Sequence, residues 1–126
     1  CALPICRLYV IGEDIIQITR DHSWVEEMVQ RGEIDRKAAR THEKKNVITR
    51  AIGGYDTVEA EMFSVDLKKE DMILMCSDGL TNMLEDQEIF HIIKSSHDIR
   101  EAAERLVSRA NDNGGRDNIS VILIEP

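Results

Sequence analysis

The stretch that decides the fold is Met-Ile-Leu-Met-Cys-Ser-Asp-Gly-Leu, residues 72–80. Its first five residues form an almost continuous apolar run of strand length, which Ser-Asp-Gly then ends in a turn. Near the C-terminus the order is reversed, because Gly-Gly-Arg-Asp-Asn at 114–118 precedes a β-prone apolar run at 119–124. Runs of this kind predict two buried strands. Each strand therefore carries an acidic turn, with Asp78 after the first and Asp117 before the second.

These two acidic turns are expected to converge if their strands are antiparallel neighbours, since the end of one strand then lies beside the start of the other. Neighbouring strands lie about 4.8 Å apart, so both carboxylates could reach the same ion. Carboxylates this close repel each other unless a cation or a proton compensates, and hard oxygen ligands suit Mg²⁺ or Mn²⁺. Ser-Asp-Gly and Arg-Asp-Asn are also ordinary turn sequences. The residues alone therefore leave both interpretations open.

The rest of the chain mixes strand and helix patterns, which predicts an α+β fold. Residues 7–12 and 15–19 predict a β-hairpin, and residues 58–65 alternate in the manner of a strand. The clearest helix begins at Ile99, with Asp98 as its N-cap, and ends at Gly114-Gly115. Shorter helices are expected at residues 24–30, 35–40 and 88–94.

The net charge disfavours two classes of protein, those that bind nucleic acid and those that bind anionic lipid. The chain has 126 residues, which suits one domain, and a formal net charge of −8. Nucleic-acid binding is disfavoured because it usually requires a basic face, and an acidic surface also repels anionic lipid. Residues 19–50 differ, with eight basic and six acidic side chains. This stretch is either a solvated helical surface or a basic flank that attracts a phosphorylated partner.

The cysteines and the hydropathy indicate a cytoplasmic protein. The three cysteines Cys1, Cys6 and Cys76 are an odd number without metal-ligand spacing. No signal peptide and no apolar run near 18 residues is evident in the sequence. We therefore expect a reducing, cytoplasmic setting without membrane insertion.

Four motifs along the chain resemble the metal-dependent protein phosphatases of the 2C type. Both acidic turns match motifs of that family, and two blocks upstream match others in the same order. The similarity runs from about Arg7 to the C-terminus and is greatest to the compact bacterial members. It identifies residues 1–126 as the C-terminal portion of a single 2C-type domain. The matching blocks are Cys-Ser-Asp-Gly-Leu at 76–80, Gly-Gly-Arg-Asp-Asn-Ile-Ser at 114–120, Ile-Thr-Arg-Asp-His-Ser at 18–23 and Asn-Val-Ile-Thr-Arg-Ala-Ile-Gly at 46–53.

This resemblance implies a four-layer α-β-β-α sandwich with antiparallel sheets, incomplete in this chain. It implies hydrolysis of phosphoserine and phosphothreonine in proteins by a metal-bridging hydroxide, as part of a larger catalytic domain. The complete family domain holds two or more ions, Mn²⁺ or Mg²⁺. The partners implied are a phosphoprotein substrate and a cognate serine/threonine kinase in signalling.

The resemblance also assigns site residues. Asp78 and Asp117 match two aspartate metal ligands, while Gly79 and Asn118 support the turns that carry them. No catalytic residue is identified apart from the metal ligands. Residues 22–50 match a flap beside the active site that influences substrate choice, and the flap residues singled out are His22, His42 and Arg50.

The chain departs from the family pattern in ways that bear on activity. The family domain is about twice as long, and its Asp-Gly-x-Gly-Gly block, a further acidic ligand and a phosphate-gripping arginine are not found in this sequence. Ile5 stands where the family has an aspartate of a third metal site. The atypical residues 1–6 suggest a truncation, a frame change or a junction.

Three interpretations follow from these departures. The first is part of a phosphatase, with this chain alone inactive because two carboxylates fill few of the six positions that Mg²⁺ requires. The second is a non-catalytic, phosphatase-like binding or regulatory module, and the third is an α+β fragment without activity. Sheets that lack strands have open edges, so we also expect self-association or domain swapping.

Overall fold

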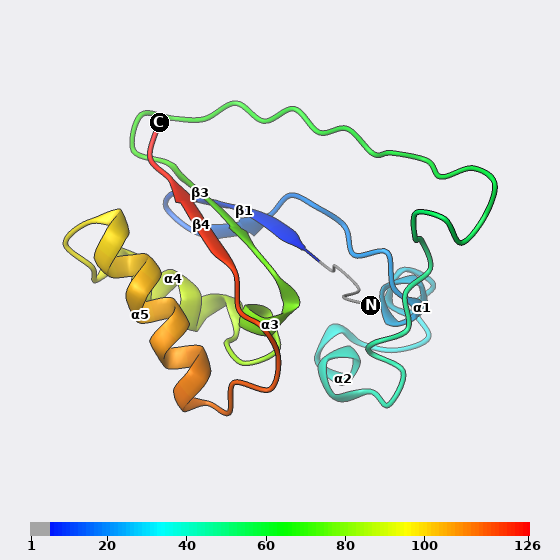
Figure 1. The fold of residues 1–126 in the computed structure, drawn as a ribbon. Coiled ribbons are helices and arrows are strands. Elements are labelled where there is room, and N and C mark those ends of the chain that lie inside the picture. Colours follow the sequence, from blue (N-terminus) through cyan, green and yellow to red (C-terminus); the bar gives the residue numbers. More distant parts are fainter. Residues whose placement is uncertain (1–5) are drawn as a thin grey trace. The chain divides into compact units, whose positions relative to one another are not determined.

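The computed structural model describes residues 6–126, which form two compact units (Figure 1). The helical unit comprises residues 20–63, and the sheet unit comprises residues 6–19 and 64–126. The expectations for Cys1 and Ile5 lie outside the described residues.

One antiparallel sheet organises the sheet unit. Its strands lie in the order β2-β1-β3-β4, so the N-terminal hairpin packs beside the strand at 72–76 and the C-terminal strand lies at the edge. This confirms both the α+β fold and the antiparallel pairing of the two strands that carry the acidic turns. The strands are β1 (Arg7–Ile11), β2 (Ile15–Gln17), β3 (Met72–Cys76) and β4 (Val121–Ile124).

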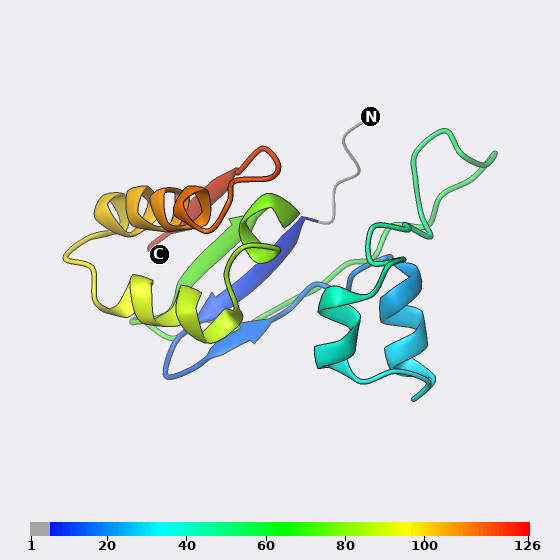
Figure 2. The same ribbon diagram turned by 90° about the horizontal axis from the view of Figure 1, so that it is seen from below.

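Helices cover one face of this sheet (Figure 2). α3 (Asp78–Thr81) follows β3 directly, and α4 (Asp86–Lys94) and α5 (Ile99–Asp112) pack over the strands. The apolar stripes of α4 and α5 bury Ile89 and Leu106 completely. They meet the inward side chains of the strands, which are Tyr9, Ile11, Leu74 and Cys76.

The ends of the longest helix, α5, are capped by the residues that the sequence predicted. The Asp98 side chain caps α5 by accepting a hydrogen bond from the Glu101 backbone N–H at 2.8 Å. At the other end Gly114 and Gly115 have φ values of +131° and +49°, which favour glycine. Among residues 6–126, no helix is both long enough and apolar enough to cross a lipid bilayer.

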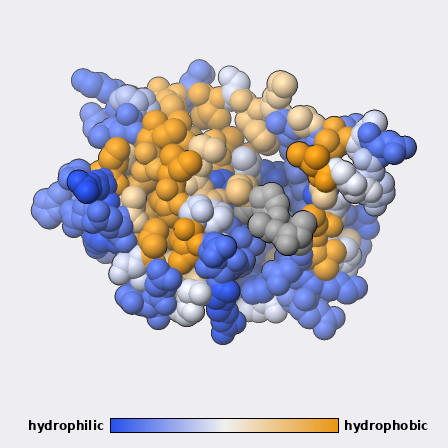
Figure 3. All heavy atoms as spheres, in the orientation of Figure 1, coloured by the Kyte–Doolittle hydropathy of each residue, from blue (hydrophilic) through white to orange (hydrophobic). Residues whose placement is uncertain are grey.

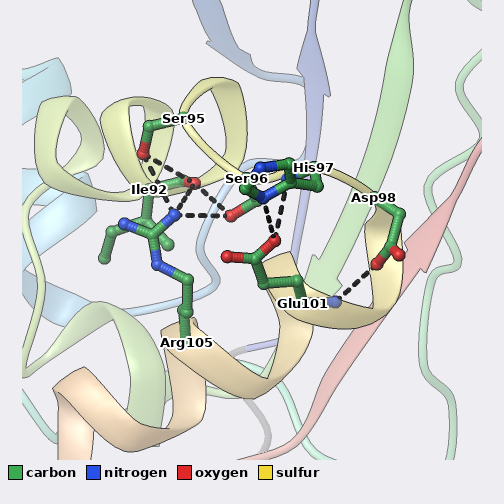
Figure 4. Close-up of polar contacts among 7 residues, drawn as sticks. All are labelled: Ile92, Ser95, Ser96, His97, Asp98, Glu101 and Arg105. Atoms are coloured by element: carbon green, nitrogen blue, oxygen red, sulfur yellow. Dashed lines mark hydrogen bonds and ion pairs between the residues drawn. The ribbon is translucent and has the colours of Figure 1, made fainter.

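Polar contacts tie the start of α5 to the end of α4 (Figure 4). Arg105 Nη1 donates hydrogen bonds to the Ser96 hydroxyl at 2.9 Å and to the Ser95 hydroxyl at 3.2 Å. The Glu101 carboxylate accepts the His97 backbone N–H at 2.9 Å. These bonds satisfy backbone and hydroxyl groups at the helix junction, so the cluster stabilises the fold.

The other face of the sheet is apolar although no helix or strand of the sheet unit is layered on it. Side chains alternate along a strand, so residues opposite each other in the register share this face. Figure 3 shows hydrophobic atoms gathered over β3 and β4. Ile16 and Ile122 are each 57% exposed. The outer face, as we call this surface, consists of Leu8, Val10, Ile16, Ile73, Met75, Ile122 and Ile124.

The helical unit contains α1 (Trp24–Gln30) and α2 (Arg36–Thr41). Ser23 caps α1 by accepting the Glu26 backbone N–H at 3.2 Å, and the Asp35 carboxylate caps α2. Ser23 also forms an isolated β-bridge with Ile48. The bridge holds the start of α1 beside residues 47–49.

The predicted strand at residues 58–65 is wrong. The segment has no regular secondary structure, and Val58 and Met62 are 52% and 94% exposed. A strand requires a neighbour to complete its backbone hydrogen bonds, and no strand within residues 6–126 pairs with this segment. An alternating pattern is therefore not sufficient to form a β-strand when no partner strand is present.

Candidate metal centre

The turns that carry Asp78 and Asp117 lie side by side at one end of the sheet. β3 pairs with β4 up to Cys76 opposite Val121. Beyond that pair the Ser77 backbone N–H donates to the Ser120 carbonyl at 3.0 Å, and the Ser120 N–H donates to Ser77 Oγ at 3.0 Å. The structure therefore confirms that the two acidic segments meet at the same corner of the sheet, although the first of them begins the short helix α3 at Asp78 and is not a turn as predicted.

The Ser77 hydroxyl and Gly79 bring the turns still closer together. Ser77 Oγ donates to the Asn118 carbonyl at 3.2 Å. A Cβ at position 79 would collide with that same carbonyl, so only glycine allows this approach. The Asn118 backbone N–H donates to Asp117 Oδ1 at 2.7 Å, which orients the second carboxylate.

The carboxylates are close enough to influence each other. Burial of half-buried Asp78 raises the pKa of its carboxyl, and the negative charge of Asp117 raises it further. The Gly79 backbone N–H and the Arg7 guanidinium oppose this change by stabilising the ionised form. A divalent cation would relieve the repulsion between the two carboxylates.

The corner has the right kind of donor atoms for a hard divalent cation, namely carboxylate oxygens, but too few side chains that supply them. Carboxylate oxygens are the ligands that Mg²⁺ and Mn²⁺ prefer. Within residues 6–126, however, His, Cys, Asp and Glu side chains nowhere converge in a group of three or more that could hold a metal ion. The corner therefore offers two carboxylates, and the remaining positions would require water or further polypeptide.

Arg7, Tyr9 and Asp86 form a polar chain that sequence reasoning missed. Arg7 Nη1 donates to the Tyr9 hydroxyl at 3.2 Å, and that hydroxyl donates to Asp86 Oδ1 at 3.2 Å. Arg7 and Tyr9 follow the strand period of two, but Asp86 lies 77 residues beyond Tyr9. No local pattern in the sequence links residues so far apart.

In the helical unit the predicted flap residues His22 and Arg50 meet on one carboxylate. His22 Nε2 and Arg50 Nη1 each lie 3.0 Å from Glu61 Oε1. The hydrogen bond from His22 lowers the pKa of the Glu61 carboxyl, and the charges of Arg50 and Arg20 act in the same direction. Glu61 was not predicted, because it lies 39 residues from His22 in a segment without helical or strand structure.

His42 makes its contacts elsewhere in the helical unit. Its ring centroid lies 5.1 Å from that of Trp24, and its Nδ1 accepts the Lys44 backbone N–H at 3.0 Å. Lys44 Nζ lies 4.8 Å from the Trp24 ring centroid, in cation–π geometry. These contacts order the end of α2.

Comparison with known proteins identifies relatives along almost the whole chain. The serine/threonine phosphatase stp of Listeria innocua is 42% identical over 120 residues, which cover 94% of this chain and 48% of the relative. The structure of the Streptococcus agalactiae serine/threonine phosphatase has a TM-score of 0.88 at 34% identity, covering 94% of this chain and 49% of that one. The catalytic domain of the phosphatase PstP, in complex with 2 manganese ions, has a TM-score of 0.82 at 30% identity and covers 96% and 50%.

The chain thus spans about half the length of the curated relatives it matches. The family model described as protein phosphatase 2C matches residues 18–119, which include both acidic turns and the predicted flap. A match over most of the chain shows that it belongs to the protein phosphatase 2C family.

Proposed function

We propose that this chain supplies part of the active site of a metal-dependent protein serine/threonine phosphatase, with Asp78 and Asp117 as metal ligands. The observation that carries the proposal is the convergence of these two carboxylates where β3 ends and β4 begins. Family membership gives the reaction class, hydrolysis of phosphoserine and phosphothreonine in proteins.

Mn²⁺ or Mg²⁺ is the cofactor that this donor set favours, and PstP was crystallised with manganese. Such a metal lowers the pKa of water and neutralises charge on a phosphoryl group. The chain's own residues hold the ligands in place. The Asn118 carbonyl accepts a hydrogen bond from the Ser77 hydroxyl and lies against Gly79. These contacts hold the two segments together and so fix the separation of the carboxylates.

The substrate is proposed to be a phosphoprotein in the cytoplasm, paired in signalling with a serine/threonine kinase. The helical unit has the role of a flap at residues 22–50 that recognises this substrate through His22, His42 and Arg50. Its support is the local excess of basic residues between residues 19 and 50.

For the chain on its own we propose metal binding without turnover. The absence of any third acidic, histidine or cysteine donor at the corner, among the residues that the structure describes, favours this. The same observation favours the second candidate function, a phosphatase-like module that binds phosphoproteins and does not hydrolyse them. Open sheet edges at β2 and β4 and the outer face are proposed to mediate self-association.

Manganese titration of the chain tests the proposal. We expect weak Mn²⁺ binding by electron paramagnetic resonance, lost in Asp78→Asn and kept in the control Asp112→Asn, an exposed aspartate at the end of α5. A phosphothreonine peptide should be hydrolysed only when the N-terminal half of a relative such as stp is added. Phosphopeptide binding that is independent of metal and of Asp78 would instead establish the non-catalytic module.

A further inference from the structure

We propose that Ser95 is a phosphorylation site and that Arg105 binds the phosphate. Ser95 is the C-cap residue of α4 and Arg105 lies on α5, so the site joins the two helices (Figure 4). The inference goes beyond the proposed function, because it involves neither the metal corner nor the helical unit.

The Arg105 side chain bonds neutral oxygen atoms through one of its nitrogens. Nη1 donates to the Ser96 hydroxyl at 2.9 Å and to the Ser95 hydroxyl at 3.2 Å, and it lies 3.5 Å from the Ile92 carbonyl oxygen. A guanidinium has five N–H donors in a planar fork. Among residues 6–126 no acceptor is bonded to Nη2 or Nε, so the donors on these atoms are available to a further acceptor.

The charge of Arg105 has no carboxylate as a direct partner. Within the part of the chain that the structure describes, no ion pair includes this guanidinium. The pKa of Glu101 is lowered first by its hydrogen bonds with His97 and only then by the Arg105 charge. A phosphate would therefore give Arg105 a charged partner, in the bidentate geometry that suits arginine.

Ser95 is better placed than Ser96 to carry this phosphate. Both hydroxyls donate to the Ile92 carbonyl, Ser96 at 2.7 Å and Ser95 at 3.3 Å. Phosphorylation removes the hydroxyl hydrogen, and if Ser95 is modified the carbonyl keeps the shorter of the two bonds. Ser95 is also exposed, whereas Ser96 is half-buried. An enzyme can therefore reach Ser95 more easily.

The modification requires a serine/threonine kinase and a nucleoside triphosphate. The Ser95 hydroxyl oxygen forms a bond to the γ-phosphorus, and the bond from that phosphorus to its bridging oxygen breaks. The nucleoside diphosphate leaves, and the hydroxyl proton passes to the base of the kinase. The product is a phosphoserine beside the Arg105 guanidinium.

Two features of the junction act against a phosphate at Ser95. The C-terminal carbonyls of α4 carry partial negative charge, and Asp98 at the N-cap of α5 is acidic. Lys94 in the last turn of α4 offsets part of this repulsion. Charge-assisted hydrogen bonds to a guanidinium are stronger than the effect of a helix end. The phosphate should therefore stabilise the junction when Arg105 is present and destabilise it when Arg105 is replaced.

Phosphoserine incorporated genetically at position 95 of the whole chain tests the site. The second pKa of phosphoserine is about 6, and ³¹P resonance should show a lower value here because Arg105 stabilises the dianion. Arg105→Gln should restore the ordinary value. Phosphorylation should also raise the thermal midpoint by a few degrees in the wild type and lower it in Arg105→Gln. Phosphoserine in place of Ser64, which is exposed in a segment without regular structure, is the matched control and should respond to neither change.

Mass spectrometry of the chain isolated from the cells that produce it, with phosphatase inhibitors present, tests whether Ser95 is modified. We expect phosphate on Ser95, and an unmodified Ser95 would overturn the modification. A phosphoserine pKa at position 95 that is the same in the wild type and in Arg105→Gln would overturn the phosphate site. Arg105→Lys keeps the charge without the planar fork, so it should give a smaller shift and serves if Arg105→Gln does not fold. Neither measurement involves a metal, so the outcome is independent of the proposed function.

Discussion

The backbone carbonyl of Asn118 lies against Gly79 so closely that a Cβ at residue 79 would overlap it. This contact joins the turn after β3 to the turn before β4. Gly79 does not have a positive φ, so the requirement for glycine here is steric. The separation of Asp78 and Asp117 thus depends on the absence of one methyl group.

Replacing Gly79 by alanine should therefore open the metal corner. We expect Gly79→Ala to destabilise the chain by about 1–3 kcal/mol, the usual cost of overpacking a close contact. Urea unfolding followed by circular dichroism measures the change. The control is Gly54→Ala, because a Cβ there would make only ordinary contacts, at 3.6 and 3.8 Å from Ala51. Equal stability of Gly79→Ala and wild type would contradict the steric argument.

The Ser77 hydroxyl is the second element that joins these turns. Ser77→Ala removes the bond to the Asn118 carbonyl and the bond from the Ser120 N–H. We expect a loss of about 1 kcal/mol in stability, typical of such bonds. Amide hydrogen exchange at Ser120 should also become faster, because the N–H loses its acceptor. Ser108→Ala, on the exposed face of α5, should leave this exchange unchanged.

Acid should release Glu61 from Arg50 and His22. The pKa of Glu61 is lowered by its hydrogen bond with His22 and by the nearby positive charges. A carboxylate with a lowered pKa stabilises the fold above its unfolded pKa and loses that contribution as the pH falls through the folded value. The pH window in which this contribution is lost therefore lies below the usual range of glutamate pKa values.

The side-chain Nε–Hε resonance of Arg50 reports this release. In the wild type it should titrate in that acidic window, and in Glu61→Gln it should be insensitive to pH there. Glu59→Gln is the matched control, since Arg50 contacts Glu59 through its backbone carbonyl. A wild-type Arg50 resonance that does not change with acid would show that the ion pair is not formed in solution.

The convergence of Asp78 and Asp117 could be predicted because its causes are local. An apolar run next to an acidic turn is visible in the sequence, and antiparallel pairing alone then brings the turns together. The capping of α5 by Asp98 could be predicted for the same reason.

The contacts that could not be predicted join residues far apart in the chain. Asp86 meets Tyr9, and Glu61 meets His22, only because the tertiary structure brings their backbones together. The segment at residues 58–65 is the opposite case, because a local pattern predicted a strand there and the prediction was wrong. It has the alternation of a strand, but a strand also needs a neighbour, which the pattern of one segment cannot reveal.

The outer face of the sheet should make the chain associate in solution. Burying apolar surface contributes roughly 25 cal/mol per Å², so the exposed apolar side chains that β2, β3 and β4 carry on this face favour a second layer. We expect the sedimentation coefficient to rise with protein concentration, and to rise less in Ile122→Lys. Ile52→Lys, 94% exposed in the helical unit, is the control. Association through strand edges uses backbone groups and would survive Ile122→Lys, so this variant separates face pairing from edge pairing. A wild-type chain that stays monomeric at high concentration would rule out both.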